Sequence, residues 1–439
     1  MNLKKYFEYA KSIGFSDIEF KTQKKSKLSI QVFHSKVEQY QVSENETLYI
    51  RGIVNGKMVS GTTENLNNVK PVLDEMVLNS SIIEEIKEQE IFAGSDKYKK
   101  LKTHSDALIN TPSTEKIDLC LQAEKKAYEY SDKVADVEEI SYEETQAAMN
   151  IVNSKGLKLS YKVSYAMLVA SVVAKDETDT RTGFSYQFGQ NLSDFDLDKL
   201  VAKACDDSIN ALNGTQCESK KYKVLLNQST FASLVNVLMN AVSGDAVNKG
   251  KSLLKDKLNQ EIASKKFTLI EDPHVKEYPF FFRGFDDEGV ATYKKAIVEK
   301  GVLKTFLYNI EAAKQAKTNS TGNGYGGSVI GISPAFLQVK LGKKSKEELC
   351  ELIKDGLYIT SVQGLHSGMN PLSGDFSLQA SGYRIENGKI TTPVNLITVA
   401  GNLFELFKNI KEVGNDAFLT YSGVCSPSVY NKSLAVSGK

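Results

Sequence analysis

Leu48-Tyr-Ile-Arg-Gly-Ile-Val54 runs through Asn55-Gly56 into Lys57-Met-Val59 near the start of this 439-residue chain. Asn-Gly readily adopts the two positive-φ conformations that a two-residue hairpin turn requires. β-Branched, aromatic and other apolar residues on both sides of the turn favour strands. The segment therefore predicts an antiparallel β-hairpin.

Helices and a further strand surround this hairpin. Leu28-Ser-Ile-Gln-Val32 alternates apolar and polar residues, which is typical of a strand with one buried face. A helix is predicted over residues 3–13, ended by a glycine, and a second helix near residues 67–79. We interpret residues 1–108 as an N-terminal α+β domain.

Two polar stretches divide the next part of the chain. Residues 87–110 are polar and charged and are interpreted as a linker. Residues 147–173 contain alternating and apolar runs that predict hairpin strands, with helices predicted on both sides. Residues 214–222 form a second polar boundary. The segment 109–220 is therefore predicted to be a middle α+β domain.

The last segment, residues 221–439, is predicted to be a strand-rich domain with inserted helices. One helix is marked by apolar side chains at helical spacing, namely Phe231, Leu234, Val235, Leu238, Met239 and Val242. A second Asn-Gly turn, Asn387-Gly388, predicts another hairpin. Residues 403–410 predict a late helix that Gly414 ends. The expected class of the whole chain is α+β, with mixed α/β N-terminal domains that contain hairpins.

The charge of the chain gives no support for a nucleic-acid partner. Lys and Arg number 55 and Asp and Glu 54, which leaves a formal net charge of +1. The two densest basic clusters are Lys24-Lys25-Ser26-Lys27 and Lys343-Lys344-Ser345-Lys346. Both lie in turn-like polar sequence and are interpreted as solvated loops. No nucleic-acid partner is expected.

The sequence is typical of a cytoplasmic protein. Its amino terminus lacks the apolar core of a signal peptide. The longest apolar run, residues 165–174, is far shorter than the ~20 residues that span a membrane. Five cysteines lie far apart without a Cys-x-x-Cys pair, which favours reduced thiols. We expect a cytoplasmic chain without membrane contact.

Local motifs for metal-dependent or nucleophilic chemistry are missing from the sequence. The four histidines, His34, His104, His274 and His366, are widely separated, whereas a zinc site built on one helix needs closely spaced ligands. No Gly-x-Ser-x-Gly elbow occurs. Cys425 lies in turn-like sequence without a basic neighbour, so a structural thiol is the better interpretation.

Two turn-rich segments remain as candidates. Thr321-Gly-Asn-Gly-Tyr-Gly-Gly327 lacks the Lys-Ser/Thr of a phosphate-binding loop and is interpreted as a loop whose backbone approaches another group closely. Asp286-Asp-Glu-Gly289 could supply carboxylates to a cation, but acidic residues before glycine commonly form a turn. Neither segment alone defines a reaction.

Seven short segments of the carboxy-terminal half follow one another in a recognisable order. They are Phe285-Asp-Asp-Glu-Gly-Val-Ala-Thr292, Glu299-Lys-Gly-Val-Leu303, Thr318-Asn-Ser-Thr-Gly-Asn323, Ser373-Gly-Asp-Phe376, Ile385-Glu-Asn-Gly-Lys389, Gly414-Asn-Asp416, and Pro427 through Leu434-Ala-Val-Ser-Gly438. In this order they resemble the TldD/PmbA family of intracellular metallopeptidases, also called the modulator-of-gyrase family. The hairpin at Arg51-Gly52 and Asn55-Gly56 is similar more loosely.

The resemblance implies a metal-binding helix that has lost its ligands. TldD-like members carry His-Glu-x-x-x-His on a helix, completed by a cysteine near the carboxy terminus. In the best alignment Met239 stands at the first His, Asn240 at the Glu and Gly244 at the second His. A thioether, an amide and a hydrogen cannot hold Zn²⁺ and activate water, and Cys425 falls after the ligand cysteine's position. No catalytic residue, metal or cofactor is therefore expected in this chain, and zinc is expected in a TldD-like partner.

This departure resembles the PmbA (TldE) branch, whose members pair with a TldD-like subunit around a proteolytic chamber. By resemblance, the partners are a TldD-like metalloprotease subunit and an unfolded or flexible peptide, with a homodimer as the alternative assembly. Seven residues are predicted to line a substrate or partner cavity: Asp286, Asp287, Glu288, Thr321, Gly322, Asn323 and Asp375.

Two other functions stay open at this point. An active metallopeptidase would need ligands that folding brings together, such as His274, His366 and Asp375. A gyrase-modulating or nucleic-acid-binding factor is suggested by the family's older name, although the near-neutral charge gives it no support.

Overall fold

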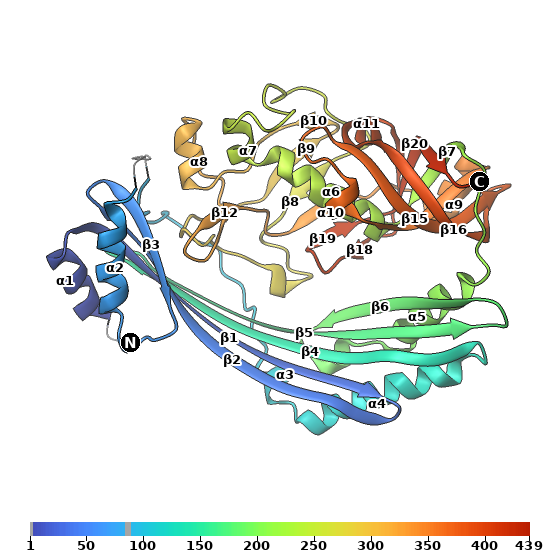
Figure 1. The fold of residues 1–439 in the computed structure, drawn as a ribbon, viewed down its shortest axis with the longest axis horizontal. Helices are drawn as coiled ribbons and strands as arrows, with labels where there is room; N and C mark the ends of the chain where they lie inside the picture. The colour runs from blue at the N-terminus through green and yellow to red at the C-terminus, as the bar shows by residue number, and fades with distance from the viewer. Residues whose placement is uncertain (1–2, 84–88) are drawn as a thin grey trace. The chain divides into compact units, whose positions relative to one another are not determined.

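The computed structural model describes residues 3–83 and 89–439 and divides the chain into two compact units (Figure 1). The first unit consists of Met1–Ser95, Lys100–Asn213 and Gly326–Val329, and the second of Asp96–Lys99, Gly214–Tyr325 and Ile330–Lys439. Both units combine helices with strands, which confirms the predicted α+β class. Within the described ranges, every helix is too short or too polar to traverse a bilayer.

The first unit is built around one antiparallel sheet of six strands, in the order β3-β2-β1-β4-β5-β6. Its elements are α1 (Leu3–Ser12), β1 (Phe15–Phe33), β2 (Lys36–Val54), β3 (Lys57–Thr63), α2 (Lys70–Ser80), α3 (Asp106–Asn110), α4 (Ser113–Tyr130), β4 (Val134–Asn153), β5 (Lys158–Lys175), β6 (Thr180–Gly189), the 3₁₀ turn η1 (Leu192–Asp194) and α5 (Leu197–Asn210).

The predicted hairpin is the β2–β3 connection. Asn55 and Gly56 have φ values of 53° and 76°, and Val54 pairs with Lys57 across the turn. On its other side β2 pairs with β1, and β1 pairs in turn with β4, where Glu19 lies opposite Asn153. The sheet therefore contains strands from both of the segments predicted as N-terminal and middle domains.

The basic cluster Lys24–Lys27 was predicted as a loop, and this is wrong because the cluster lies inside β1. Lys24 pairs with Glu46 of β2 and Lys27 with Ser43, and the Lys24 ammonium lies 2.7 Å from the Glu44 carboxylate. This part of the strand has few buried side chains. Without a buried face there is no apolar alternation by which a strand can be recognised.

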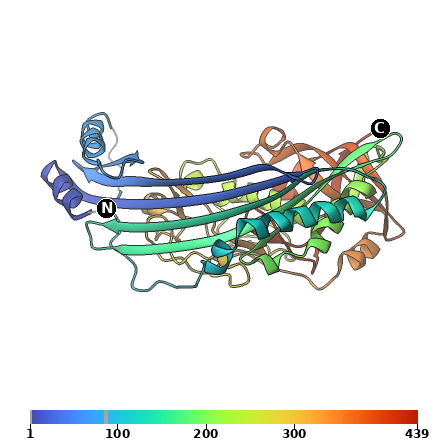
Figure 2. The same ribbon diagram turned by 90° about the horizontal axis from the view of Figure 1, so that it is seen from below.

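Two groups of apolar side chains hold the first unit together. Helices α4 and α5 pack on the strands through a core that includes Ile140, Leu168 and Leu200 (Figure 2). Helices α1 and α2 cover the region around Phe20 and Ile50. The remaining segment, Gly326–Val329, joins this unit, and the Lys21 ammonium donates a hydrogen bond to the carbonyl of Gly326.

The second half of the chain forms two further six-stranded sheets, β10-β9-β8-β13-β19-β18 and β16-β15-β14-β7-β20-β17. The elements are β7 (Lys220–Leu226), α6 (Gln228–Val242), α7 (Gly244–Asn248), β8 (Leu269–Glu271), the 3₁₀ turn η2 (Pro279–Phe281), β9 (Lys295–Glu299), β10 (Val302–Leu303), α8 (Ile310–Gln315), β11 (Gly324–Gly326), β12 (Ile330–Ile332), β13 (Leu337–Val339), α9 (Lys346–Ile353), β14 (Gly356–Gln363), α10 (Leu365–Gly368), β15 (Asp375–Glu386), β16 (Lys389–Asn402), α11 (Leu403–Lys408), β17 (Ile410–Val413), β18 (Phe418–Leu419), β19 (Val424–Ser426) and β20 (Val429–Ser437).

Helix α6 organises the core of the second unit. It packs against β14 of one sheet and β19 of the other, and its predicted apolar stripe is buried. Three aromatic rings meet there, because Phe231 lies 5.9 Å from Phe267 and 5.4 Å from Phe407, measured between ring centroids. Burial of large rings is the main stabilising contribution of such a core. The helix that carries the aligned motif positions is therefore held from both sides.

The late helix is shorter than predicted. Helix α11 ends at Lys408, and Ile410 begins strand β17, where it pairs with Asn431 of β20. Ile410 fits the helical spacing of the preceding apolar residues, but its backbone bonds go to a strand distant in sequence. Tertiary pairing overrides the local pattern at this position.

Candidate functional site

The aligned motif positions lie where α6 stops. The Asn227 side chain caps the helix by accepting a hydrogen bond from the Thr230 N–H at 2.8 Å. The helix was predicted to reach Gly244, but it ends at Val242, and Ser243 has φ −66° and ψ 124°. Two backbone hydrogen bonds explain the break: Leu307 donates to the Val242 carbonyl at 2.9 Å, and Gly244 donates to the Leu307 carbonyl at 2.8 Å. Gly244 then begins α7.

The three positions face different surroundings. Met239 is buried in the core of the second unit, whereas Asn240 is exposed. On an uninterrupted helix, positions five residues apart point about 140° away from each other. Because the helix is broken at Ser243, the helical spacing does not set the direction of Gly244, which faces Tyr308 and Leu307.

Gly244 has no room for a side chain. A Cβ atom built on it falls well inside the contact distance of the Tyr308 ring and 2.9 Å from the Leu307 carbonyl oxygen. Gly244 does not have a positive φ, so its backbone would accept any residue. The constraint is the ring of Tyr308, which fills the space that an imidazole at position 244 would need.

Cys425 was predicted in a turn, and this is wrong because it lies in β19, paired with Gln338 of β13 and Leu419 of β18. The side chain is 5% exposed. Burial raises the pKa of its thiol, and the neighbouring Glu277 carboxylate raises it further. A protonated, enclosed thiol is a poor nucleophile and a poor metal ligand, so the structural interpretation stands.

The donor groups of the second unit do not fit a zinc ion. In residues 3–83 and 89–439, no three His, Cys, Asp or Glu side chains lie close enough together to hold a metal. His274 instead makes a hydrogen bond with the Thr292 hydroxyl at 3.2 Å. His366 is exposed in α10, and Asp375 accepts hydrogen bonds from Ser373 and Asn402. The alternative ligand set is not assembled.

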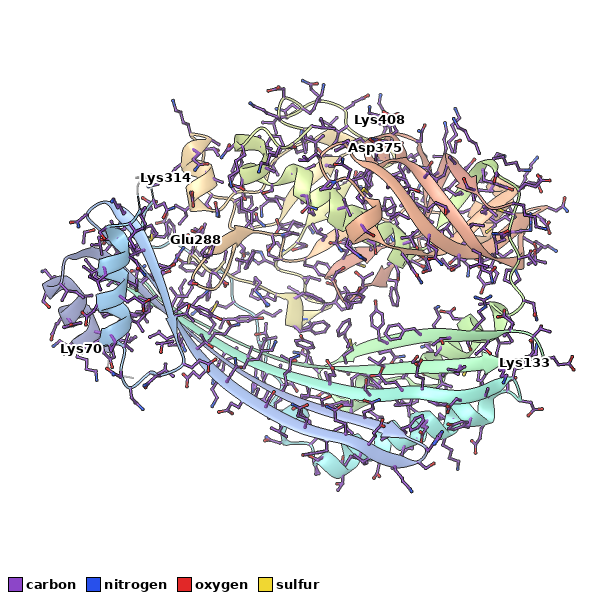
Figure 3. The ribbon with its side chains drawn as sticks, viewed as in Figure 1. Lys70, Lys133, Glu288, Lys314, Asp375 and Lys408 are labelled. Atoms are coloured by element: carbon purple, nitrogen blue, oxygen red, sulfur yellow. The ribbon has the colours of Figure 1, made fainter. Side chains whose placement is uncertain are left out.

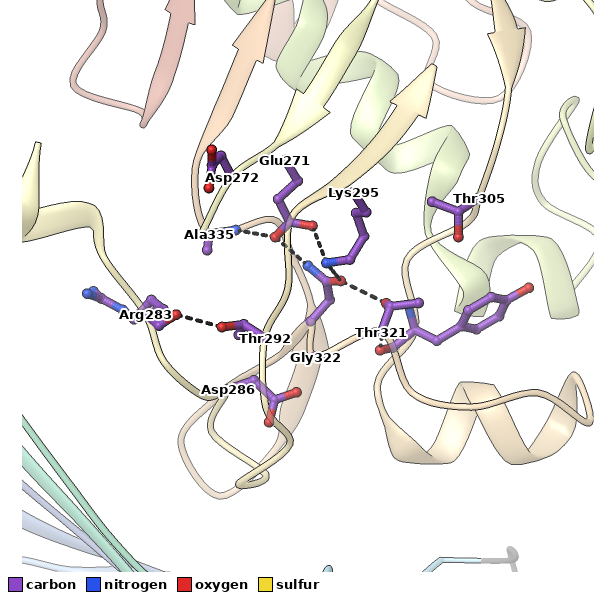
Figure 4. A network of polar contacts seen from close by, with 12 residues as sticks. Glu271, Asp272, Arg283, Asp286, Thr292, Lys295, Thr305, Thr321, Gly322 and Ala335 are labelled. Carbon is purple, nitrogen blue, oxygen red and sulfur yellow. Dashed lines mark hydrogen bonds and ion pairs between the residues drawn. The ribbon is translucent and has the colours of Figure 1, made fainter. Parts of the chain in front are cut away.

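A buried ion pair lies at the centre of the predicted cavity residues (Figure 4). The Lys295 ammonium is 2.8 Å from one Glu271 carboxylate oxygen, and these side chains are 5% and 0% exposed. The other oxygen accepts hydrogen bonds from the Asn323 amide at 2.8 Å and from the Ala335 N–H at 2.9 Å. The Lys295 ammonium also donates to the Asn323 carbonyl at 3.3 Å. Every charge in this network is compensated by a direct neighbour.

The segment Thr321–Gly327 joins this network to the part of the chain that follows β10. The Thr321 hydroxyl donates to the Asn323 side-chain oxygen at 2.7 Å and accepts from the Tyr308 N–H, also at 2.7 Å. Gly322 has φ 71° and approaches the backbone of Ala291, where a Cβ would lie 3.0 Å from the carbonyl oxygen. The segment is thus the close-approach loop that was predicted, and Gly324–Gly326 continues it as β11.

The acidic segment Asp286–Gly289 forms the predicted turn, and its backbone closes around the Asp286 carboxylate. One oxygen of this buried carboxylate accepts hydrogen bonds from the Glu288 and Val290 N–H groups at 3.0 and 2.9 Å. The other oxygen accepts from the Gly324 N–H at 2.9 Å. Burial and the Glu288 carboxylate raise the pKa of Asp286, and the three backbone donors oppose them without cancelling them.

Glu288 ties the same turn to α8. Its carboxylate accepts a hydrogen bond from the Ile310 N–H at 2.8 Å, and Gly324 has no Cβ that would collide with it. Asp287 contributes its backbone, which donates to the Gly324 carbonyl at 2.8 Å. Beside this turn, the buried Tyr325 hydroxyl has no hydrogen-bond partner among the described residues. Burial and nearby carboxylates, Glu271 and Asp286 first, raise the pKa of this phenol.

Asp286, Glu288, Thr321, Gly322 and Asn323 therefore gather in one polar cluster, with the backbone of Asp287. Asp375 lies apart from them, as its position relative to Glu288 in Figure 3 shows. It anchors Asn402, whose side chain caps α11.

Sequence reasoning missed Glu271, Lys295 and Tyr325. The available signal was a charged residue at the end of each of two short apolar strands, Glu271 in Leu269–Glu271 and Lys295 in Lys295–Glu299. Single charges at the ends of strands are usually exposed, so neither stood out.

The stability contribution of Asp286 is expected to depend on pH. Its pKa is higher in the folded protein than the ordinary 3.8, so the folded state binds the proton more tightly than the unfolded chain. Its favourable contribution is then complete below about pH 4 and is lost as the pH rises through the folded pKa. The free energy of unfolding of wild type minus that of Asp286→Asn should fall over this range, measured by urea denaturation.

Asp375→Asn is the matched control, since hydrogen bonds from Asn402 and Ser373 lower the pKa of that exposed carboxylate. The free energy of unfolding of wild type minus that of Asp375→Asn should instead grow as the pH rises toward 3.8, the ordinary pKa of an aspartate. Equal pH dependence in the two variants would contradict the assignment.

Comparison with known proteins links the fold to one family. Residues 219–438 match the family described as PmbA/TldA metallopeptidase C-terminal domain, and residues 106–212 match the PmbA/TldA metallopeptidase central domain. The metalloprotease PmbA homologue of Buchnera aphidicola is 27% identical over 449 aligned positions, covering 99% of this chain and 96% of that protein.

Two crystal structures have the same fold. A candidate modulator of DNA gyrase from Thermotoga maritima superposes with a TM-score of 0.91 at 29% identity, covering 99% of both chains. TldE from Thermococcus kodakarensis superposes with a TM-score of 0.90 at 21% identity, covering 99% of this chain and 100% of that one. At this lower identity the likeness is one of fold.

Proposed function

Because the chain belongs to the PmbA/TldD family of metallopeptidases, we propose that it is a PmbA/TldE-type subunit of a complex that degrades or matures peptides. In this proposal the chain does not carry the catalytic metal. A TldD-like partner subunit supplies the zinc and the water-activating glutamate, and this chain helps to form the chamber and to admit an extended peptide.

The position of Gly244 carries the proposal. A catalytic zinc needs three protein ligands and an open position for water. At the aligned positions, the Met239 side chain is buried, Asn240 offers only a neutral amide, and Gly244 lies against the Tyr308 ring. Neither the donors nor the space for a second imidazole is available there.

The buried cluster around Glu271 supports a structural role in the chamber. Four segments of the chain converge on it: the end of β8, the start of β9, the turn Asp286–Gly289 and the loop that contains Thr321 and Asn323. Compensated charges and closed turns of this kind fix loop positions. We propose that the cluster holds the two loops as a rigid part of the chamber wall.

The test is reconstitution with a partner that carries His-Glu-x-x-x-His. We expect the purified chain alone to bind no stoichiometric zinc and to leave a flexible peptide intact. Co-purification with the partner should give a complex with zinc in the partner only, and the complex should cleave the peptide. A partner with its motif glutamate replaced by glutamine serves as the control and should form an inactive complex.

Stoichiometric zinc together with peptidase activity from this chain alone would contradict the proposal. Failure of the chain to associate with any such partner would contradict the heteromeric part of it.

A further inference from the structure

The distal half of β2 forms an open edge of the first unit's sheet. Strand β1 pairs with β2 along its length, but β3 covers only Leu48–Val54 on the other side. Residues 36–46 therefore have no second neighbouring strand in the described part of the chain, and all of them are exposed. An open edge presents backbone N–H and C=O groups that another strand can pair with.

The centre of this edge lacks the proline or charged side chain with which soluble proteins usually protect open strands. It contains no proline, and its central residues, 39–43, carry no charge. Val37, Tyr40 and Val42 are 42%, 50% and 62% exposed. The Tyr40 hydroxyl lies 2.9 Å from that of Ser113, the first residue of α4. An uncharged stretch of an open edge with exposed apolar side chains is a surface on which another strand can pair.

The charges at both ends of this edge are self-complementary. If two copies pair antiparallel with Tyr40 opposite Tyr40, then Lys36 of each copy lies opposite Glu44 of the other. In the same register Glu38 lies opposite Val42, so no like charges meet. Moving the two-fold axis to Gln41 places Glu38 opposite Glu44, and moving it to Val42 places Glu38 opposite Glu46. Moving it to Gln39 places Lys36 opposite Val42, so the two ion pairs are lost. Directly opposed like charges are unfavourable in an antiparallel pair, so the first register is favoured.

We propose that residues 36–46 of β2 pair with the same residues of a second copy of this chain, with the two-fold axis at Tyr40. The two six-stranded sheets then continue into each other through the β2 edges. Main-chain hydrogen bonds supply the association, the Tyr40 pair and Val42 supply apolar contact, and the Lys36–Glu44 pairs set the register. This inference does not rest on the function proposed above.

Two single charge reversals test the register. In Lys36→Glu, a symmetric pair would place the introduced glutamate opposite Glu44 twice, and in Glu44→Lys it would place the introduced lysine opposite Lys36 twice. We expect the wild-type chain to dimerise in a concentration-dependent way by sedimentation or light scattering. For each variant alone, the dissociation constant of the dimer should be at least about tenfold higher than for wild type. Glu44 also pairs with Lys24 of its own chain, and Lys36→Glu leaves that exposed pair intact.

Mixing the two variants gives the decisive measurement. In the mixed dimer, the introduced glutamate of one chain meets the introduced lysine of the other, and the native Glu44 of the first meets the native Lys36 of the second. Both ion pairs therefore return, and the mixture should dimerise as strongly as wild type. Lys27→Glu makes the same charge change on β1, away from the edge, and should leave dimerisation unchanged.

The outcomes that overturn the proposal are equally clear. A wild-type chain that stays monomeric, a dimer insensitive to both reversals, or a mixture no stronger than its components would each exclude this interface. Circular dichroism of the variants separates loss of pairing from loss of fold, since both positions are exposed. The readout needs neither a partner subunit nor peptidase activity, so it is independent of the reconstitution experiment.

Discussion

Gly244→Ala lowers the free energy of unfolding by about 2 kcal/mol or more, and Gly244→His lowers it further. The added Cβ would overlap the Tyr308 ring and approach the Leu307 carbonyl, and the backbone there is fixed by two hydrogen bonds to Leu307. Alanine is otherwise favoured over glycine in a helix, so propensity alone predicts the opposite sign. Chemical denaturation measures the difference.

A double-mutant cycle assigns this cost to the ring. Tyr308→Ala removes the ring, so Gly244→Ala should cost much less in the Tyr308→Ala background than in wild type. Equal costs in both backgrounds would show that Tyr308 is not the obstacle.

The same geometry makes the metal motif hard to restore. A chain carrying Met239→His, Asn240→Glu and Gly244→His together should bind no stoichiometric zinc while Tyr308 is present, as measured by metal analysis after dialysis. Stoichiometric zinc in that triple variant would contradict the role given to Tyr308.

Lys295→Ala is expected to destabilise the second unit by about 3–5 kcal/mol, because it leaves the Glu271 carboxylate buried without its cation. Glu271→Leu should cost a similar amount by stranding the ammonium together with the Asn323 amide and the Ala335 N–H. The double variant Lys295→Ala with Glu271→Leu should be more stable than the sum of the two single changes predicts. Urea denaturation of the four proteins measures the coupling.

The neighbouring lysine is the control. Lys294 pairs with Asp272 at 2.6 Å, but its side chain is 57% exposed. Lys294→Ala should therefore change the stability by no more than about 1 kcal/mol. If Lys294→Ala and Lys295→Ala lowered the free energy of unfolding by similar amounts, burial of the Lys295–Glu271 pair would not explain the cost.

The hairpins could be predicted because their signals are local. Asn55-Gly56 and Asn387-Gly388 both adopt the positive φ values that their chemistry favours. The α6 stripe was predicted for the same reason, since its apolar spacing matches the helical period. The long pairing of β1 with β4 has no such signal, because it joins residues more than a hundred positions apart. Local sequence cannot show which strands become neighbours.

Some residues of the candidate site could likewise be predicted from the sequence, and others depend on contacts between distant segments. Resemblance singled out Asp286, Thr321 and Asn323, which the fold brings into one cluster. It did not reveal Glu271 and Lys295, whose meaning depends on strand pairing between β8 and β9. The end of α6 at Val242 was missed because the competing backbone partner, Leu307, is distant in the chain.

The central place of β1 in its sheet constrains the order of folding during synthesis. Its first neighbour, β2, follows at once, but its second neighbour, β4, is complete only when the chain reaches Asn153. Until then the β1–β2 hairpin has an unpaired side along most of β1. The nascent amino-terminal segment therefore exposes a long strand edge whose backbone N–H and C=O groups can pair with other chains. Such late, distant pairings fold slowly and are where a growing chain is most in need of protection from its neighbours.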